Sequence, residues 1–138
     1  MKHLSVKIVT PQSVVVSEEY ISASIPTVTG ELTILPNHLP LVGKIKAGEI
    51  VLRREDGESR LSVSSGILEV RPESHLVILA DDALRAENID VERAEEAKKR
   101  VEKLLLEKKN EKDVDYAKLQ GFLEKEMARI KVGKKYRR

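Results

Sequence analysis

The sequence predicts an α+β protein, in which an N-terminal antiparallel β-sandwich of short strands precedes a C-terminal antiparallel hairpin of two helices. Two observations lead to this prediction. All five prolines and five of the seven glycines lie within residues 1–86, and turn-forming residues at that density divide a chain into short elements. Residues 87–138 contain no proline, and their apolar residues recur at the three- and four-residue intervals of a helix. We therefore expect two domains, residues 1–86 and residues 87–138.

The first strands are predicted from local patterning. Leu4, Val6 and Ile8 alternate with polar residues, which is the period of a strand with one buried face. Residues 14–16 form a β-branched run, Val-Val-Val, and such runs favour strands.

Two β-hairpins are predicted next. The first pair of strands flanks Asp56-Gly57, a dipeptide that strongly indicates a hairpin turn, and the second pair brackets Pro72-Glu73-Ser74. So many short strands indicate an antiparallel sandwich or a flattened barrel. The paired segments are residues 50–54 with 60–64, and residues 67–70 with 76–79.

The helical half contains two amphipathic segments. The first is predicted to begin near Asp90, residues 110–113 interrupt the pattern, Asp113 or Asp115 caps the second helix, and Gly133 ends it. The seam between the helices is narrow and rich in alanine, so the hairpin should depend on whatever surface it docks against. The predicted apolar stripes are Ala94, Ala97, Val101 and Leu104, then Tyr116, Leu119, Leu123, Met127 and Ile130.

Composition excludes several kinds of chemistry. The chain has no cysteine, so neither disulfides nor thiolate catalysis is available to it. His3, His38 and His75 show no metal-ligand spacing, and neither a glycine-rich phosphate loop nor a nucleophile elbow is present. The start lacks the apolar region of a secretory signal, and no apolar run is long enough to span a bilayer. We expect an intracellular protein that is not an enzyme, holds no metal and requires no cofactor.

Charge is distributed unevenly between the halves. Residues 1–86 contain 9 Lys/Arg against 11 Asp/Glu, whereas residues 87–138 contain 16 against 12. A basic end predicts an acidic partner, which is a nucleic acid, an anionic membrane or an acidic protein surface; the alternative is a solvated tail without a partner. The last basic residues, with no acidic residue among them, are Arg129, Lys131, Lys134, Lys135, Arg137 and Arg138.

Residues 30–42, Gly-Glu-Leu-Thr-Ile-Leu-Pro-Asn-His-Leu-Pro-Leu-Val, form the most specific motif. Its two X-Pro steps fix extended backbone on either side of Asn37-His38, which predicts a rigid loop. The string resembles the G-E-x-x-I-L-P-x-H-x-P-L signature of the epsilon-subunit family of bacterial F-type ATP synthases. The resemblance extends nearly end to end, through residues 45–50, 63–70, 77–81 and 113–116.

The resemblance implies a ten-stranded β-sandwich followed by a helical hairpin, in a non-catalytic subunit of the rotor's central stalk. Such a subunit lies between the gamma subunit and the ring of membrane-embedded c subunits, peripheral to the cytoplasmic face of the bacterial membrane. By position, the family's contact with the ring falls on Gly30, Glu31 and Leu32. Its contact with gamma falls on His38, Leu41 and Val42.

In this family the hairpin is the regulator of ATP hydrolysis. Extended along gamma into the catalytic alpha/beta head it opposes hydrolysis, and folded against the sandwich it permits turnover; the sequence leaves both positions open. Exposed ion pairs contribute only ~0–1 kcal/mol each, so a brake needs several of them. The basic residues that the resemblance directs at an acidic stretch of the beta subunits are Lys98, Lys99, Arg100, Lys103 and Arg129.

Some bacterial members bind ATP as a regulatory ligand on the folded hairpin, through the motif I-D-x-x-R-A. Residues 89–94 match it, but Leu84 stands where these members have a glutamate and Lys125 replaces an arginine. Asp90 is also a favourable helix cap without any ligand, so both interpretations stay open. The implied ATP site comprises Ile89, Asp90, Arg93, Ala94, Arg100, Lys125 and Arg129.

Two other functions are compatible with parts of the sequence. A nucleic-acid-binding module would use the basic half, but aromatic residues for base stacking make up only 3% of the chain, and acidic residues interleave the basic ones up to residue 126. A small nucleotide hydrolase rests on residues 89–94 alone. Neither function accounts for residues 30–42, so we expect no nucleic-acid partner and no turnover.

Overall fold

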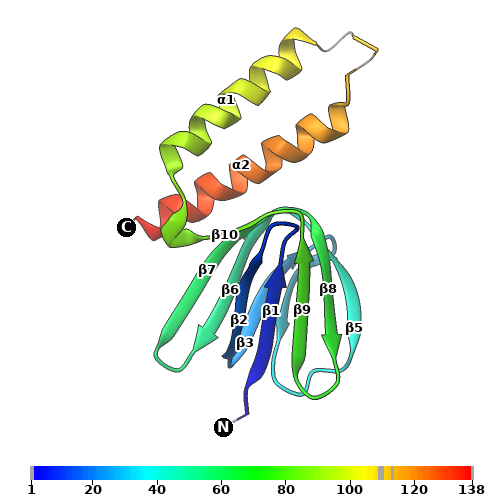
Figure 1. The fold of residues 1–138 in the computed structure, drawn as a ribbon, viewed down its shortest axis with the longest axis vertical. Helices are drawn as coiled ribbons and strands as arrows, with labels where there is room; N and C mark the ends of the chain where they lie inside the picture. Colours follow the sequence, from blue (N-terminus) through cyan, green and yellow to red (C-terminus); the bar gives the residue numbers. More distant parts are fainter. Residues whose placement is uncertain (1, 109–110, 113, 138) are drawn as a thin grey trace.

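The structure, a computed structural model, describes residues 2–108, 111–112 and 114–137. It shows a ten-stranded β-sandwich with two helices beyond one end of it, as the sequence predicts (Figure 1). The strands are β1 (Leu4–Val9), β2 (Val14–Tyr20), β3 (Ser22–Thr27), β4 (Gly30–Ile34), β5 (Leu41–Ile45), β6 (Gly48–Arg54), β7 (Gly57–Val63), β8 (Gly66–Arg71), β9 (His75–Ala80) and β10 (Ala83–Arg85). The helices are η1 (Ala86–Asn88), α1 (Val91–Glu107) and α2 (Tyr116–Tyr136).

The strands form one hydrogen-bonded path, in the order β10-β7-β6-β3-β5-β8-β9-β1-β2, with β4 paired to β3. Among the described residues every pairing is antiparallel except that of β1 with β9. Both predicted hairpins are confirmed, as β6–β7 and β8–β9. Four pairs of consecutive strands, β1–β2, β3–β4, β6–β7 and β8–β9, are antiparallel hairpins.

The core of the sandwich is built from the predicted alternation. Leu4, Val6 and Ile8 are at most 1% exposed, and the same buried cluster takes at least one residue from each of the ten strands. Fully burying one such aliphatic side chain contributes roughly 1.5–3 kcal/mol. The sandwich therefore has a continuous core of its own.

The loop of residues 35–40 is fixed to the β8–β9 connection at the end away from the helices. Asn37 has φ 66°, and Glu73 and Ser74 have φ 66° and 60°, so three non-glycine residues adopt the left-handed region there. The backbone N–H of Asn37 donates to Ser74 Oγ at 2.8 Å. This bond supports the rigid loop that the two prolines predict.

Both helices begin at an aspartate cap. Asp90 accepts a hydrogen bond from the Arg93 backbone N–H at 3.1 Å, and Asp115 accepts one from Lys118 at 3.0 Å. Both caps were predicted from the sequence. Of the predicted alternatives for the second helix, Asp113 lies outside the described residues.

Gly133 does not end the second helix, contrary to the prediction, since α2 continues to Tyr136. The glycine is buried, and a Cβ built on it would lie 2.6 Å from Val91 Cγ2 and 2.8 Å from Ile89 Cγ2. Gly133 therefore allows α2 to approach the start of α1 closely, and its role is packing.

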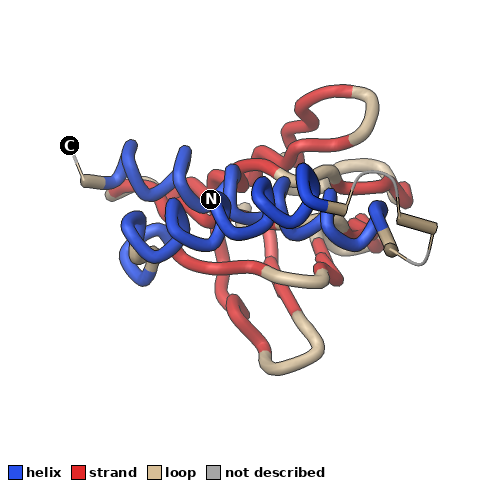
Figure 2. The backbone as a smooth tube through the Cα atoms, turned by 90° about the horizontal axis from the view of Figure 1, so that it is seen from above, coloured by secondary structure: helices blue, strands red, loops and turns tan. Residues whose placement is uncertain are grey.

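The helices lie side by side over one end of the sandwich, and the C-terminal half of α2 is nearest to it (Figures 1 and 2). In this docked position α2 contacts β7, β6 and η1. The predicted stripe of α2 is wrong at Met127, which is 49% exposed, whereas Glu126 and Ala128 are buried. The helix α2 packs against two surfaces, α1 and the sandwich. The buried face of α2 is therefore rotated away from its apolar stripe.

Candidate functional site

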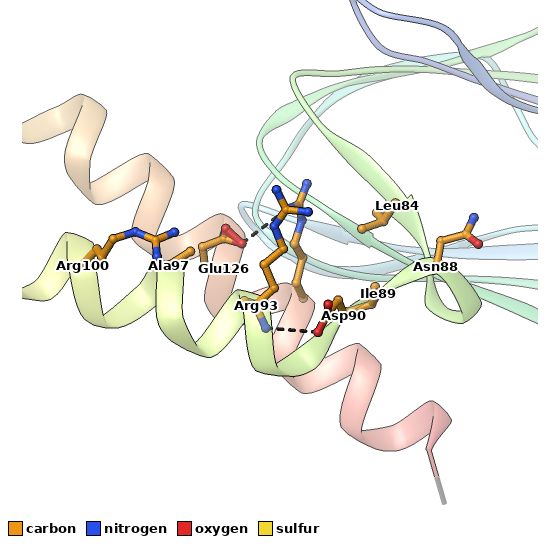
Figure 3. Close-up of a pocket in the computed structure, with 10 residues that line it drawn as sticks. Leu84, Asn88, Ile89, Asp90, Arg93, Ala97, Arg100 and Glu126 are labelled. Atoms are coloured by element: carbon orange, nitrogen blue, oxygen red, sulfur yellow. Dashed lines mark hydrogen bonds and ion pairs between the residues drawn. The ribbon is translucent and has the colours of Figure 1, made fainter.

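A cavity of about 350 Å³ lies where the hairpin meets the sandwich, between the start of α1, the middle of α2 and the segment after β10 (Figure 3). We call this region the joint. It is lined by Leu84, Asn88, Ile89, Asp90, Arg93, Ala94, Ala97, Arg100, Glu126 and Arg129.

The structure brings together most of the predicted ATP-binding residues. All of them line the cavity except Lys125. The Lys125 ammonium lies 4.9 Å from the centre of the Phe122 ring, in a cation–π arrangement, and beside a neighbouring groove that includes Asp82. Leu84 contributes an apolar wall to the cavity.

Glu126 is a residue of the joint that sequence reasoning missed. It is 5% exposed, and one of its carboxylate oxygens lies 3.4 Å from Arg129 Nη1. An acidic residue among alternating charges is typical of a solvated helix face, so the pattern gives no sign of burial. Only its three-residue spacing from Arg129 suggests the pair.

Arg129 connects the hairpin to the sandwich. Its Nη2 donates to both carboxylate oxygens of Asp82, each at 2.9 Å, and Asp82 lies in the connection between β9 and β10. Its Nη1 donates to Glu126. Two carboxylates therefore hold one guanidinium at the edge of the cavity.

The basic C-terminal end finds acidic partners inside the chain. Lys134 lies 3.2 Å from Glu95 and Arg137 lies 3.6 Å from Glu92, so both residues join α2 to α1. Arg138 lies outside the described residues. In the docked position these cations are therefore not a free basic surface.

Lys135 makes a second connection to the sandwich. It lies 3.3 Å from Glu49 of β6, which also accepts a hydrogen bond from Arg60 at 2.8 Å. The hydrogen bond to Glu58, together with the charge of Glu49, raises the pKa of the Arg60 guanidinium. Glu49 thus lies between two basic side chains, Arg60 and Lys135.

The residues predicted to contact the catalytic head do not share one surface in this position. Lys98, Lys99, Arg100 and Lys103 lie on α1, and the last three of these are exposed. Arg129 instead lies in the joint, where Asp82 and Glu126 hold it.

The residues predicted to contact the membrane ring lie on β4. Gly30, with φ 123°, and Glu31 are exposed at the end of the sandwich that faces the helices. Leu32 packs partly against the core.

The residues predicted to contact gamma begin at the opposite end of the sandwich. His38 is in the 35–40 loop, where its Nδ1 lies 2.8 Å from the Leu39 carbonyl. Leu41 packs partly against the core, and Val42 is 72% exposed. His38 therefore lies at the end of the sandwich away from Gly30. Val42 is nearer to the ring set, because Ile45 of the same strand pairs with Thr27, the partner of Gly30.

Val42 belongs to an exposed apolar surface that the sequence did not reveal. Ile67 of β8 pairs directly with Leu79 of β9, and Lys44, two residues after Val42, pairs with Ile67. Ile67 and Leu79 are 49% and 55% exposed and lie on the same side as Val42. We call these three residues the β5–β8–β9 face. Contiguous exposed apolar side chains mark interaction surfaces.

No helix within the described ranges has the length and apolar character needed to cross a membrane.

Comparison with known proteins gives one consistent family. The family model described as ATP synthase, Delta/Epsilon chain, beta-sandwich domain, matches residues 3–86. The model of the long alpha-helix domain of the same chains matches residues 87–134.

Relatives named ATP synthase epsilon chain match along almost their whole length. The Moorella thermoacetica protein is 41% identical over 132 residues, covering 95% of this chain and 96% of its own. The Dehalococcoides mccartyi protein is 42% identical over 138 residues, covering 100% and 97%.

Two solved structures share the fold. One is a chain of the Euglena gracilis mitochondrial ATP synthase OSCP/F1/c-ring structure, with TM-score 0.69 and 20% identity, covering 91% of this chain and 77% of that one. The other is from the Tetrahymena thermophila mitochondrial ATP synthase central stalk/c-ring structure, with TM-score 0.59 and 13% identity, covering 99% and 98%. Together, the family models and the full-length relatives show that the chain belongs to the ATP synthase delta/epsilon chain family.

Proposed function

We propose that this chain is the non-catalytic epsilon subunit of an F-type ATP synthase. In this proposal the sandwich joins the catalytic head to the ion-translocating c ring, within the central stalk, and the hairpin inhibits ATP hydrolysis when it leaves the sandwich. The observation that carries it is a self-sufficient sandwich with a two-helix arm held at one joint. The relatives named ATP synthase epsilon chain support the assignment. The subunit would be peripheral to the cytoplasmic face of the cell membrane.

The sandwich is proposed to bind gamma through the β5–β8–β9 face and the adjoining His38 and Leu41. Exposed aliphatic side chains at 49–72% leave apolar area that a partner can cover. The c ring is proposed to contact the first three residues of β4, Gly30, Glu31 and Leu32. A well-packed sandwich suits a transmitting element, because close-packed interiors have low compressibility.

The hairpin is proposed to meet the catalytic alpha/beta subunits once it is released. Lys99, Arg100 and Lys103 are already exposed in the docked position, whereas Arg129 is held in the joint. Release would therefore free Arg129 from Asp82 and Lys135 from Glu49, whereas Lys134 and Arg137 would keep their partners within the hairpin. One exposed ion pair contributes too little free energy to hold the hairpin against an acidic surface, but several pairs formed together would contribute enough.

We also propose ATP as a candidate ligand, which would regulate the docked hairpin. Three guanidinium groups line the cavity, and planar guanidinium forks pair well with phosphate oxygens. A ligand at ten times its dissociation constant stabilises the docked state by only ~1.4 kcal/mol, so it can shift a balanced equilibrium without forcing a biased one.

Isothermal titration of the whole chain with ATP tests this ligand. We expect heat of binding that is lost in Arg93→Gln, whereas Lys125→Gln, which changes a residue outside the cavity, keeps it. Absence of heat in the unaltered chain would remove ATP as a ligand.

The main proposal is tested by ATP hydrolysis in an epsilon-free catalytic head that contains gamma. Either the full chain or a truncation ending after residue 86 is added, and binding of both is confirmed first. We expect inhibition by the full chain and none by the truncation. If both bind and neither slows hydrolysis, the subunit couples without regulating.

A further inference from the structure

Among the described residues, two ion pairs run from α2 to the sandwich. They are Arg129 with Asp82, and Lys135 with Glu49. The other pairs of α2 stay within the hairpin, so they move with it and cannot hold it down.

The two pairs that cross the interface differ in geometry and exposure. The Arg129 and Asp82 side chains are 24% and 29% exposed, and one guanidinium nitrogen reaches both carboxylate oxygens at 2.9 Å. Lys135 is 47% exposed, and its ammonium lies 3.3 Å from a Glu49 oxygen that Arg60 already binds. Charge-assisted hydrogen bonds at short distance in partly desolvated surroundings are the stronger class. The Arg129–Asp82 pair is therefore the principal electrostatic contact of docking.

Glu126 stays paired with Arg129 when the hairpin leaves the sandwich. It lies three residues before Arg129 on the same helix, so the two side chains leave the sandwich together. Arg129 then keeps one carboxylate partner and needs no other to be neutralised. Asp82 is the part of this cluster that only the docked state supplies.

We propose that Asp82 is a built-in anion that latches the hairpin to the sandwich and so maintains the docked position without any bound ligand. The latch also determines when Arg129 is available. Among the described residues, Arg93 and Arg100 of the cavity make no ion pair, whereas Arg129 is occupied by Asp82. A phosphate ligand in the docked state, or an acidic partner surface, must therefore compete with Asp82 for this guanidinium. The inference rests on the docked geometry and does not require the proposed function.

The absence of cysteine allows the docked fraction to be measured by thiol labelling of the whole chain. Val132 of α2 is fully buried in the docked position, so the thiol introduced by Val132→Cys reacts with a maleimide only after opening. In this background we expect Asp82→Asn to raise the labelling rate about tenfold. That change corresponds to about 1.4 kcal/mol, the order expected for one charge-assisted hydrogen-bonded pair.

Three controls separate the latch from other effects. Arg137→Gln removes an exposed pair inside the hairpin and should change the rate less than twofold. Asp82→Glu keeps the charge and should restore a rate close to that of the unaltered latch. A second thiol, introduced by Val63→Cys in the sandwich core, should label at the same rate with and without Asp82→Asn.

The backbone of residue 82 is unaffected by these changes, because its carbonyl, which accepts from the Ser64 N–H at 3.0 Å, is present in every variant. The proposal is overturned if Asp82→Asn leaves the Val132→Cys labelling rate unchanged. It is also overturned if Asp82→Glu opens the hairpin as much as Asp82→Asn, or if the Val63→Cys thiol is exposed equally.

Discussion

The sandwich and the hairpin are held by different kinds of contact. The sandwich buries aliphatic side chains from all ten strands, most of them large and many with no exposed surface. The hairpin's buried residues are fewer and smaller, and one of them is charged. A buried alanine or glycine removes little apolar area from water, so ion pairs and close backbone approach carry much of the docking. The buried residues described in α1 and α2 are Val91, Ala94, Glu126, Ala128, Val132 and Gly133.

This difference suits the roles proposed above, in which the sandwich keeps its shape and the hairpin leaves it. Local opening requires few buried apolar contacts, and such regions exchange between states below the free energy of global unfolding. The joint satisfies that condition because its strongest contacts are polar and can be replaced by water or by another partner. The following changes test the contrast, from the largest expected effect to the smallest.

Truncating a core residue of the sandwich should cost the most. Leu61 of β7 is fully buried, and Leu61→Ala should lower the free energy of unfolding by roughly 2–5 kcal/mol, through lost burial and the cavity left behind. Urea denaturation of the whole chain measures it. The matched control is Leu106→Ala on the hairpin, where the side chain is 73% exposed and the change should be within about 0.5 kcal/mol. Equal losses would mean that the hairpin is as tightly packed as the sandwich.

Adding one methyl group to the sandwich at Gly66 should be nearly as damaging. A Cβ there would lie 2.3 Å from the Leu79 carbonyl oxygen and 2.8 Å from Ala80 Cα, and these backbone atoms are fixed by pairing of β8 with β9. We expect Gly66→Ala to lower stability by roughly 1–3 kcal/mol, as a reduced midpoint of thermal unfolding. An unchanged midpoint would show that the strands separate easily at this position.

The same substitution within α2 should have opposite effects at two positions. At Gly121 a Cβ meets nothing within 4 Å, so Gly121→Ala should stabilise the helix by up to about 1 kcal/mol. At Gly133 the methyl group meets Val91 and Ile89, so Gly133→Ala should lose that gain and loosen the joint by roughly 1–2 kcal/mol relative to Gly121→Ala. Hydrogen exchange of α1 and α2 measures both, and equal protection in the two variants would contradict the close approach.

The smallest effect is expected at the outer ion pair. Lys135→Gln removes a half-exposed ammonium from Glu49, which keeps Arg60, so docking should weaken by about 0–1 kcal/mol. The effect should shrink further in 0.5 M salt, because exposed pairs are screened. Labelling of the Val132→Cys thiol at two salt concentrations measures this weakening. If Lys135→Gln weakens docking as much as Asp82→Asn does, the Arg129–Asp82 pair is not the stronger of the two.

The features predicted correctly from the sequence are those that depend on neighbouring residues in the chain. The alternation of Leu4, Val6 and Ile8 determines a buried strand face, and Asp90 and Asp115 mark helix starts, because each signal depends on neighbouring residues alone. The motif of residues 89–94 predicts four of the ten residues that line the cavity for the same reason, since one helix start positions them.

The remaining features depend on how elements meet in space. A helical period gives a stripe, but it does not say that α2 faces two surfaces, so Glu126 and Gly133 were not expected to be buried and Met127 was expected to be. Ile67 and Leu79 were predicted only as strand residues, because their exposure depends on which sheet face the core occupies. The pairing of Arg129 with Asp82 joins residues 47 positions apart and has no local signal.

Native-state hydrogen exchange of the whole chain tests most directly the central claim that the hairpin leaves a sandwich that stays folded. The amides of α1 and α2 should exchange through an opening of lower free energy than those of the core strands β1, β6 and β7. Low urea concentrations should leave this opening almost unchanged while they lower the free energy of the core opening. If helix and strand amides instead exchange with the same free energy and the same urea dependence, the two regions unfold as one, and the hairpin is not a separable arm.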